Sequence, residues 1–285
     1  MITSLANGKI KRLITLQEKS RARNKERLFI AEGIKMFEEA PLKYLREVYV
    51  SETLWRELEE ERHRVLWKKL NNCMEQKIPV EQVSEEVFKK ASDTRTPQGI
   101  LFVMEQFSYT IERLMKGAKE KQEAGGKAPL FLLLEDIQDP GNLGTIIRTC
   151  EGAGTDGVIM SRGTVDIYNP KTIRSTMGSL YRVPFFYTQD LEGIIKLLQE
   201  NQIKVYAAHL KGEKFFDEAV YEGGSAFLIG NEGNGLRTET ADLADSYLKI
   251  PMEGSLESLN AAVAAALLLY QAAGYHRKRH EETEK

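Results

Sequence analysis

From residue 130 onward, short apolar runs alternate with helix-like segments, and this alternation limits the fold more than any other feature of the sequence. Strands separated by helices in this way are typical of a mostly parallel sheet with helices on its faces. We expect strands at residues 130–134, 157–161, 183–187, 204–208, 226–229 and 247–250. We expect helices at residues 144–153, 170–180, 191–201, 236–241 and 258–275. The sequence therefore predicts an α/β fold.

The first third of the chain is organised differently. It mixes helix-like segments at 33–40 and 54–69 with β-branched runs at 47–50 and 100–105, which indicates a small α/β domain. A charged, helix-prone stretch then ends at the Gly125-Gly126 pair, where we expect a domain boundary. The predicted organisation is a first domain at 1–107, a linker at 108–128, a second domain at 129–275 and a charged tail at 276–285.

The composition excludes several classes of protein. Apolar residues make up 42% of the chain, enough for packed cores. The longest apolar run, 261–270, is too short to span a bilayer, and residues 1–12 lack the apolar core of a signal peptide. We therefore expect a cytoplasmic protein that does not bind a membrane. Cys73 and Cys150 are too few for a four-cysteine zinc site, so we expect reduced thiols and no metal.

The net charge of −2 hides a basic segment at the start of the chain. Residues 1–27 contain eight basic and two acidic side chains, and such a segment favours contact with a polyanion. A solvated helix face explains the same pattern equally well. The candidate RNA-binding residues are Arg12, Arg21, Arg23, Lys25 and Arg27.

Three polar or glycine-rich segments follow predicted strands, at residues 135–148, 229–236 and 250–260. Ligands of open α/β sheets lie beyond the carboxyl ends of the strands, so these segments are candidates for a binding site. In the first segment Asn142 stands where a helix cap is favoured, and Arg148 follows about two turns later among apolar residues. Capping explains Asn142 but not Arg148. Each segment taken singly has a structural explanation as a turn or a cap.

The three segments together, in this order, resemble the motifs of a known family. Asn-x-Gly-x-x-x-Arg stands at 142–148, Gly-Asn-Glu-Gly-x-Gly-Leu at 230–236, and Ile-Pro-Met-x-Gly-x-x-x-Ser-Leu-Asn at 250–260. This combination resembles the SpoU, or TrmH, branch of the SPOUT RNA methyltransferases, over roughly residues 129–275. Residues 29–33 and 96–100 resemble, more loosely, the substrate-binding domain that precedes the catalytic domain in ribosomal-RNA members.

The resemblance implies a fold, a cofactor and an activity. It implies a C-terminal trefoil knot, a rare exception to the rule that chains avoid knots, and a homodimer. It implies methylation of a ribose 2'-hydroxyl in structured RNA, most of all 23S ribosomal RNA, with S-adenosylmethionine as cofactor. The implied cofactor-binding residues are Gly230, Asn231, Ile250, Leu259 and Asn260. The implied catalytic residues are Arg148, Asn142, Glu232, Ser258 and Asn260.

Methyl transfer from a sulfonium is an in-line displacement that needs alignment and deprotonation of the hydroxyl but no metal. Arginine stays protonated in proteins, so we expect Arg148 to bind the target phosphate and stabilise the developing 2'-oxyanion rather than act as base. A phosphate-assisted base remains open. Asn142 is expected to orient Arg148 or the ribose, and Glu232 to fix Asn142 or Arg148. Ser258 and Asn260 would complete the site.

Three other functions stay open from the sequence. A dinucleotide-binding enzyme of Rossmann type would need Gly-x-Gly-x-x-Gly after a strand, and residues 139–144 lack that spacing. A catalytically inactive RNA-binding or ribosome-assembly protein is not favoured, because all five implied catalytic residues are intact. A transfer-RNA 2'-O-methyltransferase would use the same motifs.

Overall fold

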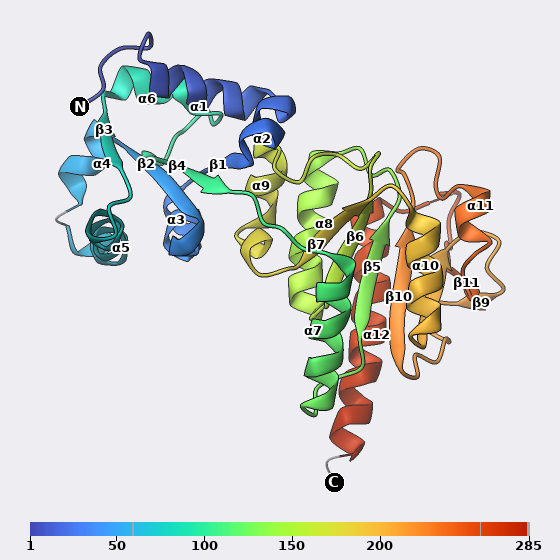
Figure 1. The fold of residues 1–285 in the computed structure, drawn as a ribbon. Helices are drawn as coiled ribbons and strands as arrows, with labels where there is room; N and C mark the ends of the chain where they lie inside the picture. Colours follow the sequence, from blue (N-terminus) through green and yellow to red (C-terminus); the bar gives the residue numbers. More distant parts are fainter. Residues whose placement is uncertain (59, 257, 284–285) are drawn as a thin grey trace. The chain divides into compact units, whose positions relative to one another are not determined.

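Two sheets organise the residues that the structure describes, which are 1–58, 60–256 and 258–283 of a computed structural model (Figure 1). The chain divides into two compact units. The first comprises Met1–Phe107 together with Asp166–Tyr181, and the second comprises Ser108–Val165 together with Arg182–Lys285. The chain therefore leaves the second unit after Val165, contributes one segment to the first unit, and returns to the second unit at Arg182.

The sheet of the second unit is parallel throughout, which confirms the predicted mostly parallel α/β fold. Its strand order is β7-β6-β5-β10-β8-β11-β9, and each neighbouring pair runs in the same direction. The strands are β5 (Leu130–Leu134), β6 (Gly157–Ser161), β7 (Phe185–Thr188), β8 (Ile203–Ala208), β9 (Lys214–Phe215), β10 (Gly224–Ile229) and β11 (Ser246–Lys249). All but β9 lie at positions that the apolar runs predict. A two-residue strand such as β9 is too short to leave a pattern in the sequence.

Helices cover both faces of this sheet (Figure 1). The helices are α7 (Ile111–Glu123), α8 (Pro140–Ala153), α10 (Leu191–Glu200), α11 (Thr238–Ala241) and α12 (Ala261–Thr283). On one face α7, α10 and α11 pack apolar side chains such as Ile111, Ile195 and Ala241 against the strands. On the other face α12 packs against α8, β10 and β5. Strands buried on both faces explain the continuous apolar run of β5.

The end of the chain crosses back over the sheet. β11 lies two strands away from β10, yet α12 packs against β10 and β5. Residues 250–260 must therefore return past the ends of β8 and β10, and Glu257 of this segment lies outside the described residues. This return path is consistent with the trefoil knot that the resemblance implies.

The sheet of the first unit is mixed, in the order β1-β4-β2-β3, with β3 parallel to β2 and the other pairs antiparallel. Its strands are β1 (Leu28–Glu32), β2 (Leu45–Ser51), β3 (Val80–Val83) and β4 (Ile100–Glu105). Its helices are α1 (Gly8–Glu18), α2 (Ser20–Glu26), α3 (Ile34–Glu39), α4 (Glu52–Glu57), α5 (Arg64–Glu75), α6 (Glu85–Ala91) and α9 (Pro170–Thr176), with 3-10 turns at Leu42–Tyr44, Glu61–His63 and Ser179–Tyr181. Residues of β1 and β4 alternate between two cores, one under α1 and α6 and one beside α3.

The expected helix at 54–69 is wrong as a single element. The structure has α4, which ends at Glu57, and α5, which begins at Arg64, while residue 59 lies outside the described residues. Several acidic residues lie between α4 and α5. In a continuous helix Glu57 and Glu61 would lie on one face and repel each other, which disfavours a single helix here. Strands β1 and β3 were not expected, because their short runs have no clear alternation.

Three segments differ from the expected organisation. Residues 108–128, expected as a linker, contain α7, which buries Ile111, Leu114 and Ala118 in the second unit. Residues 166–181, expected inside the second domain, belong to the first unit. In the expected tail, α12 continues to Thr283 and His276 is buried, while residues 284–285 lie outside the described residues.

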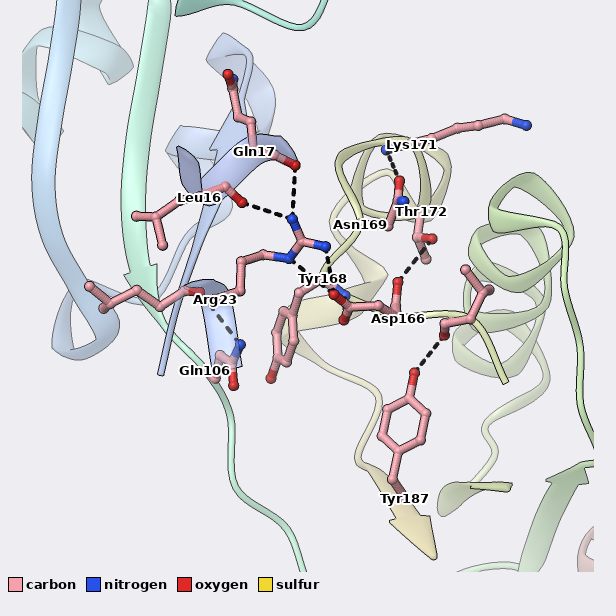
Figure 2. A network of polar contacts seen from close by, with 12 residues as sticks. Leu16, Gln17, Arg23, Gln106, Asp166, Tyr168, Asn169, Lys171, Thr172 and Tyr187 are labelled. Carbon is pink, nitrogen blue, oxygen red and sulfur yellow. Dashed lines mark hydrogen bonds and ion pairs between the residues drawn. The ribbon is translucent and has the colours of Figure 1, made fainter. Parts of the chain in front are cut away.

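A buried ion pair holds segment 166–181 in the first unit (Figure 2). Arg23 is only 3% exposed, and its Nε and Nη2 donate to Asp166 Oδ2 over 3.0 and 2.7 Å. Its Nη1 donates to the carbonyl oxygens of Leu16 and Gln17, both at 2.8 Å. Tyr168 stacks on Phe29 with 4.7 Å between ring centroids. The guanidinium therefore joins the end of α1 to a segment that lies far away in the sequence.

We expect Arg23→Ala to destabilise the first unit by about 3 kcal/mol, because it leaves the Asp166 carboxylate without its partner. Both tryptophans, Trp55 and Trp67, lie in this unit. The change in tryptophan fluorescence during urea unfolding therefore reports on the first unit alone. The control is Arg21→Ala, which removes an exposed neighbouring arginine. Equal unfolding midpoints for the two variants would show that the ion pair does not stabilise the unit.

Candidate active site

Two neighbouring strands place the first two candidate segments side by side. β5 and β10 pair in parallel, with Leu134 opposite Ile229, and both strands end there. The segments that follow, 135–148 and 230–237, therefore begin next to each other at the carboxyl edge of the sheet. A hydrogen bond from Glu135 N to Ile229 O (2.9 Å) extends the pairing by one residue.

The loop after β10 is a tight turn held by its own backbone. Asn231 N donates to Gly235 O over 3.0 Å, and Gly235 N donates back to Asn231 O over 2.9 Å. The Asn231 side-chain oxygen accepts from Gly233 N and Asn234 N. A Cβ at Gly230 would overlap the backbone of Gly235, so only glycine fits at the start of this loop.

The Glu232 carboxylate ties this loop to the segment after β5. It accepts hydrogen bonds from Gln138 N at 3.0 Å, Asp139 N at 3.1 Å and Asn142 Nδ2 at 2.9 Å. Partial burial acts to raise the pKa of Glu232, but the hydrogen bonds to its charged form outweigh it, so the pKa lies below its ordinary value. Glu232 is therefore a carboxylate at neutral pH and a weak base.

Asn142 and Asn260 extend this link to the third segment. Asn260 Nδ2 donates to Asn142 Oδ1 over 2.8 Å, and Asn260 Oδ1 accepts from Ala262 N at the start of α12. The expectation that Asn142 caps α8 is wrong: Asp139 is the cap, and its carboxylate accepts from Asn142 N over 2.8 Å. Because Asn142 stands inside the first turn, its side chain is available to bridge Glu232 and Asn260. The three segments converge through this chain of side chains.

A cavity of about 320 Å³ lies beside the loop after β10. Six of the residues implied by the resemblance line it, namely Gly230, Asn231, Glu232, Ile250, Ser258 and Leu259. Asn142, Arg148 and Asn260 are not among its lining residues. His209, which the motifs do not include, also lines the cavity. It follows β8 directly, and its ring stacks on Tyr247 with 4.9 Å between ring centroids. A polar residue directly after a strand was the signal that would have indicated it.

Arg148 stands apart from these hydrogen bonds. It is exposed on α8 and has no hydrogen bond or ion pair with any residue that the structure describes. Its neighbours Ile146, Ile147 and Cys150 are fully buried, so the helix turns its apolar side to the sheet and its guanidinium to solvent. The guanidinium is thus free to bind an anion from solution.

The candidate RNA-binding residues of the first unit fall into two groups. Arg21, Lys25 and Arg27 are exposed and form no ion pair with residues in the described ranges. Arg12 pairs with Glu26 and Glu47, and Arg23 is buried against Asp166. The guanidinium of Arg23 is committed to the fold, so we leave it out of the RNA-binding set.

The described part of the chain contains no cluster of three or more His, Cys, Asp or Glu side chains that could hold a metal ion. Within the same residues, no helix is long and apolar enough to cross a membrane. Cys73 and Cys150 are buried and unpaired with each other.

Two known protein families match this chain, one in its N-terminal part and one in its C-terminal part. Residues 129–270 match the SpoU rRNA Methylase family, and residues 7–101 match the MRM3-like substrate binding domain. A 23S rRNA (guanosine(2553)-2'-O)-methyltransferase of Bacillus subtilis is 33% identical over 96% of this chain and 99% of its own length. A putative TrmH family tRNA/rRNA methyltransferase of Staphylococcus aureus is 30% identical over 74% of this chain and 83% of its own length.

Solved structures agree with this match. An rRNA methyltransferase from Sinorhizobium meliloti superposes with a TM-score of 0.81 at 27% identity, over 96% of this chain and 97% of its own. Its AdoMet-bound form superposes with a TM-score of 0.80 over the same shares.

We expect Gly230→Ala to abolish binding of S-adenosylmethionine, because the added methyl group would push the loop after β10 out of its turn. Isothermal titration calorimetry with S-adenosylmethionine measures this. The control is Gly117→Ala on the exposed side of α7, where an added Cβ meets no atom within 4 Å. Gly230→Ala with the affinity of the control would show that the turn does not shape the cavity.

Proposed function

This chain belongs to the SpoU rRNA methylase family, and we propose that it transfers the methyl group of S-adenosylmethionine to a ribose 2'-hydroxyl of RNA. The observation that carries the proposal is the hydrogen-bonded chain from Glu232 through Asn142 to Asn260, which joins three loops beside one cavity. All three loops contain the residues that the family motifs require. Arg148 follows Asn142 on α8, is exposed and has no ion pair among the described residues, so it would supply a cation for the substrate.

The cavity supports S-adenosylmethionine as the cofactor. Its volume of about 320 Å³ lies within the usual range for small-molecule sites. Gly230, Asn231, Ile250 and Leu259 line it and would hold the cofactor, whereas Asn260 lies outside its wall and would act through Asn142. When bound, the cofactor supplies an electrophilic methyl group on a sulfonium.

The side chains suggest a division of roles. Glu232 is anionic and fully engaged with Gln138, Asp139 and Asn142, so it would orient Asn142 rather than take a proton. Arg148 would bind the phosphate beside the target ribose and stabilise the oxyanion that forms as the 2'-hydroxyl passes its proton to a phosphate oxygen or to solvent. Ser258 lines the cavity and would contact the ribose or the cofactor.

We propose ribosomal RNA as the substrate, because a 23S ribosomal-RNA enzyme is similar over 96% of this chain and because residues 7–101 match a substrate-binding domain. The exposed Arg21, Lys25 and Arg27 would contact its phosphates. Transfer RNA is the second candidate, since the staphylococcal relatives are named for both RNAs. An enzyme that modifies ribosomal RNA would work in the cytoplasm, where we expect that RNA to be assembled.

We also propose a homodimer. α8 and α12 pack together. On α12, Val263 and Tyr270 have exposed fractions of 47% and 54%. Exposed apolar side chains on one face of a helix are typical of an interaction surface. A second copy on this surface would lie beside the helix that carries Arg148.

We expect Arg148→Ala to bind S-adenosylmethionine normally and to lose methylation by about a hundredfold or more, because it removes the charge that stabilises the oxyanion. Single-turnover assays with tritiated cofactor measure the rate, and calorimetry measures the affinity. Arg148→Lys keeps the positive charge and should retain part of the activity. Near-normal turnover of Arg148→Ala would remove this residue from the mechanism.

We expect cells without the gene to lose one ribose methylation in 23S ribosomal RNA. Mapping of 2'-O-methylated positions in total RNA, with and without the gene, tests this. Complementation with the wild-type gene should restore the mark, and complementation with Arg148→Ala should not. An unchanged ribosomal-RNA profile with a lost transfer-RNA mark would replace the proposed substrate.

A further inference from the structure

Glu135 is a buried carboxylate at the carboxyl end of β5. Its side chain is 1% exposed. Oε2 accepts from Arg237 N at 2.7 Å, and Oε1 accepts from Arg237 Nε at 2.9 Å and from Thr240 Oγ1 at 2.6 Å. Arg237 Nη2 lies 2.7 Å from the same Oε1. A carboxylate is costly to bury unless its oxygens are hydrogen-bonded, and these donors meet that requirement.

The donors come from the segment that follows the loop after β10. Arg237 is the N-cap residue of α11, and Thr240 lies inside α11. Leu236, directly before Arg237, lines the cavity and is buried in the apolar core. Glu135 itself is not among the lining residues. Its carboxylate therefore fixes the backbone next to a cavity wall without facing the cavity.

Glu135 completes a set of three attachments between the two segments. Asn231 Nδ2 donates to Asp136 O over 2.8 Å, and the Glu232 carboxylate accepts from Gln138 N and Asp139 N. These two attachments hold the first half of the loop. Among the described residues, only Glu135 makes a comparable polar attachment between the segment after β5 and the second half of the loop after β10. The hydrogen bond to Glu135, and then the charge of Glu135, raise the pKa of the Arg237 guanidinium.

We infer that Glu135 is a positioning residue for cofactor binding: through Arg237 and Thr240 it holds Gly235 and Leu236 in the place where they form the wall of the cavity. The inference rests on the proposed function, since it takes S-adenosylmethionine as the ligand of this cavity. Glu135 makes no contact with the reacting atoms in this role. Its loss should therefore weaken cofactor binding and leave the rate of the chemical step largely intact.

The test is Glu135→Gln, which keeps the size of the side chain but places an amide NH₂ against donors that need an acceptor. We expect the KM for S-adenosylmethionine, and its Kd by calorimetry, to rise about tenfold, with kcat within roughly twofold of wild type. This is the reverse of the split expected for Arg148→Ala. The matched control is Glu200→Gln, which removes an exposed carboxylate at the end of α10 and should leave both parameters unchanged.

Two milder variants keep the inference testable if Glu135→Gln does not fold. Thr240→Val removes one donor to the carboxylate, and Arg237→Lys keeps the charge but loses the two-nitrogen contact. Each should raise KM less than Glu135→Gln does. The Glu135→Gln, Thr240→Val double variant should raise KM by less than the product of the two single effects, because both act on the same attachment.

The outcomes separate this inference from the proposed function. A wild-type protein that does not bind S-adenosylmethionine overturns both. Wild-type binding with unchanged KM in Glu135→Gln, or in the two milder variants, overturns only the role of Glu135. A purely structural role would lower kcat, cofactor affinity and RNA affinity together, and that result would also overturn the inference.

Discussion

The hydrogen bonds of the Glu232 carboxylate are the interaction on which the candidate site depends. They join the loop after β10 to backbone N–H groups that lie more than ninety residues earlier in the chain. A negative charge at the start of α8 is also favoured by the helix dipole. With Glu232 in place, Asn142 is turned toward Asn260, and the third loop is brought to the first two.

The two carboxylates of the site act in opposite directions across the same pair of strands. Glu232 belongs to the loop after β10 and receives donors from the segment after β5, while Glu135 follows β5 and receives donors from the residues after that loop. The hydrogen bonds of the two carboxylates together form a frame that joins the segment after β5 to the segment after β10. Arg148 is outside this frame and has no partner in the described residues, which leaves its charge for a substrate. A cavity whose wall is held in place, and a cation that remains available for the substrate, are what an alignment-dependent transfer reaction needs.

Residue type alone overestimates the basic surface of the first unit. Arg23 and Arg21 differ by two positions on one helix, yet one is buried in an ion pair with Asp166 and the other is exposed. The buried arginine helps to explain why residues 166–181 belong to the first unit although they lie between two strands of the second. Charge counting cannot distinguish the two roles, because the partner of Arg23 lies 143 residues away.

The sequence by itself determined the parallel sheet, the positions of most of its strands, and the motifs whose order indicates the family. These follow from local hydrophobic patterns and from short residue spacings, which do not depend on distant contacts. Only the tertiary structure decided that Asp139 rather than Asn142 caps α8, that Arg23 is buried, that α7 packs into the second unit, and that Glu135 holds Arg237 and Thr240. Each of these depends on which side chain lies opposite across the fold. The identity of such a partner is set by strand order and packing, not by the neighbouring sequence.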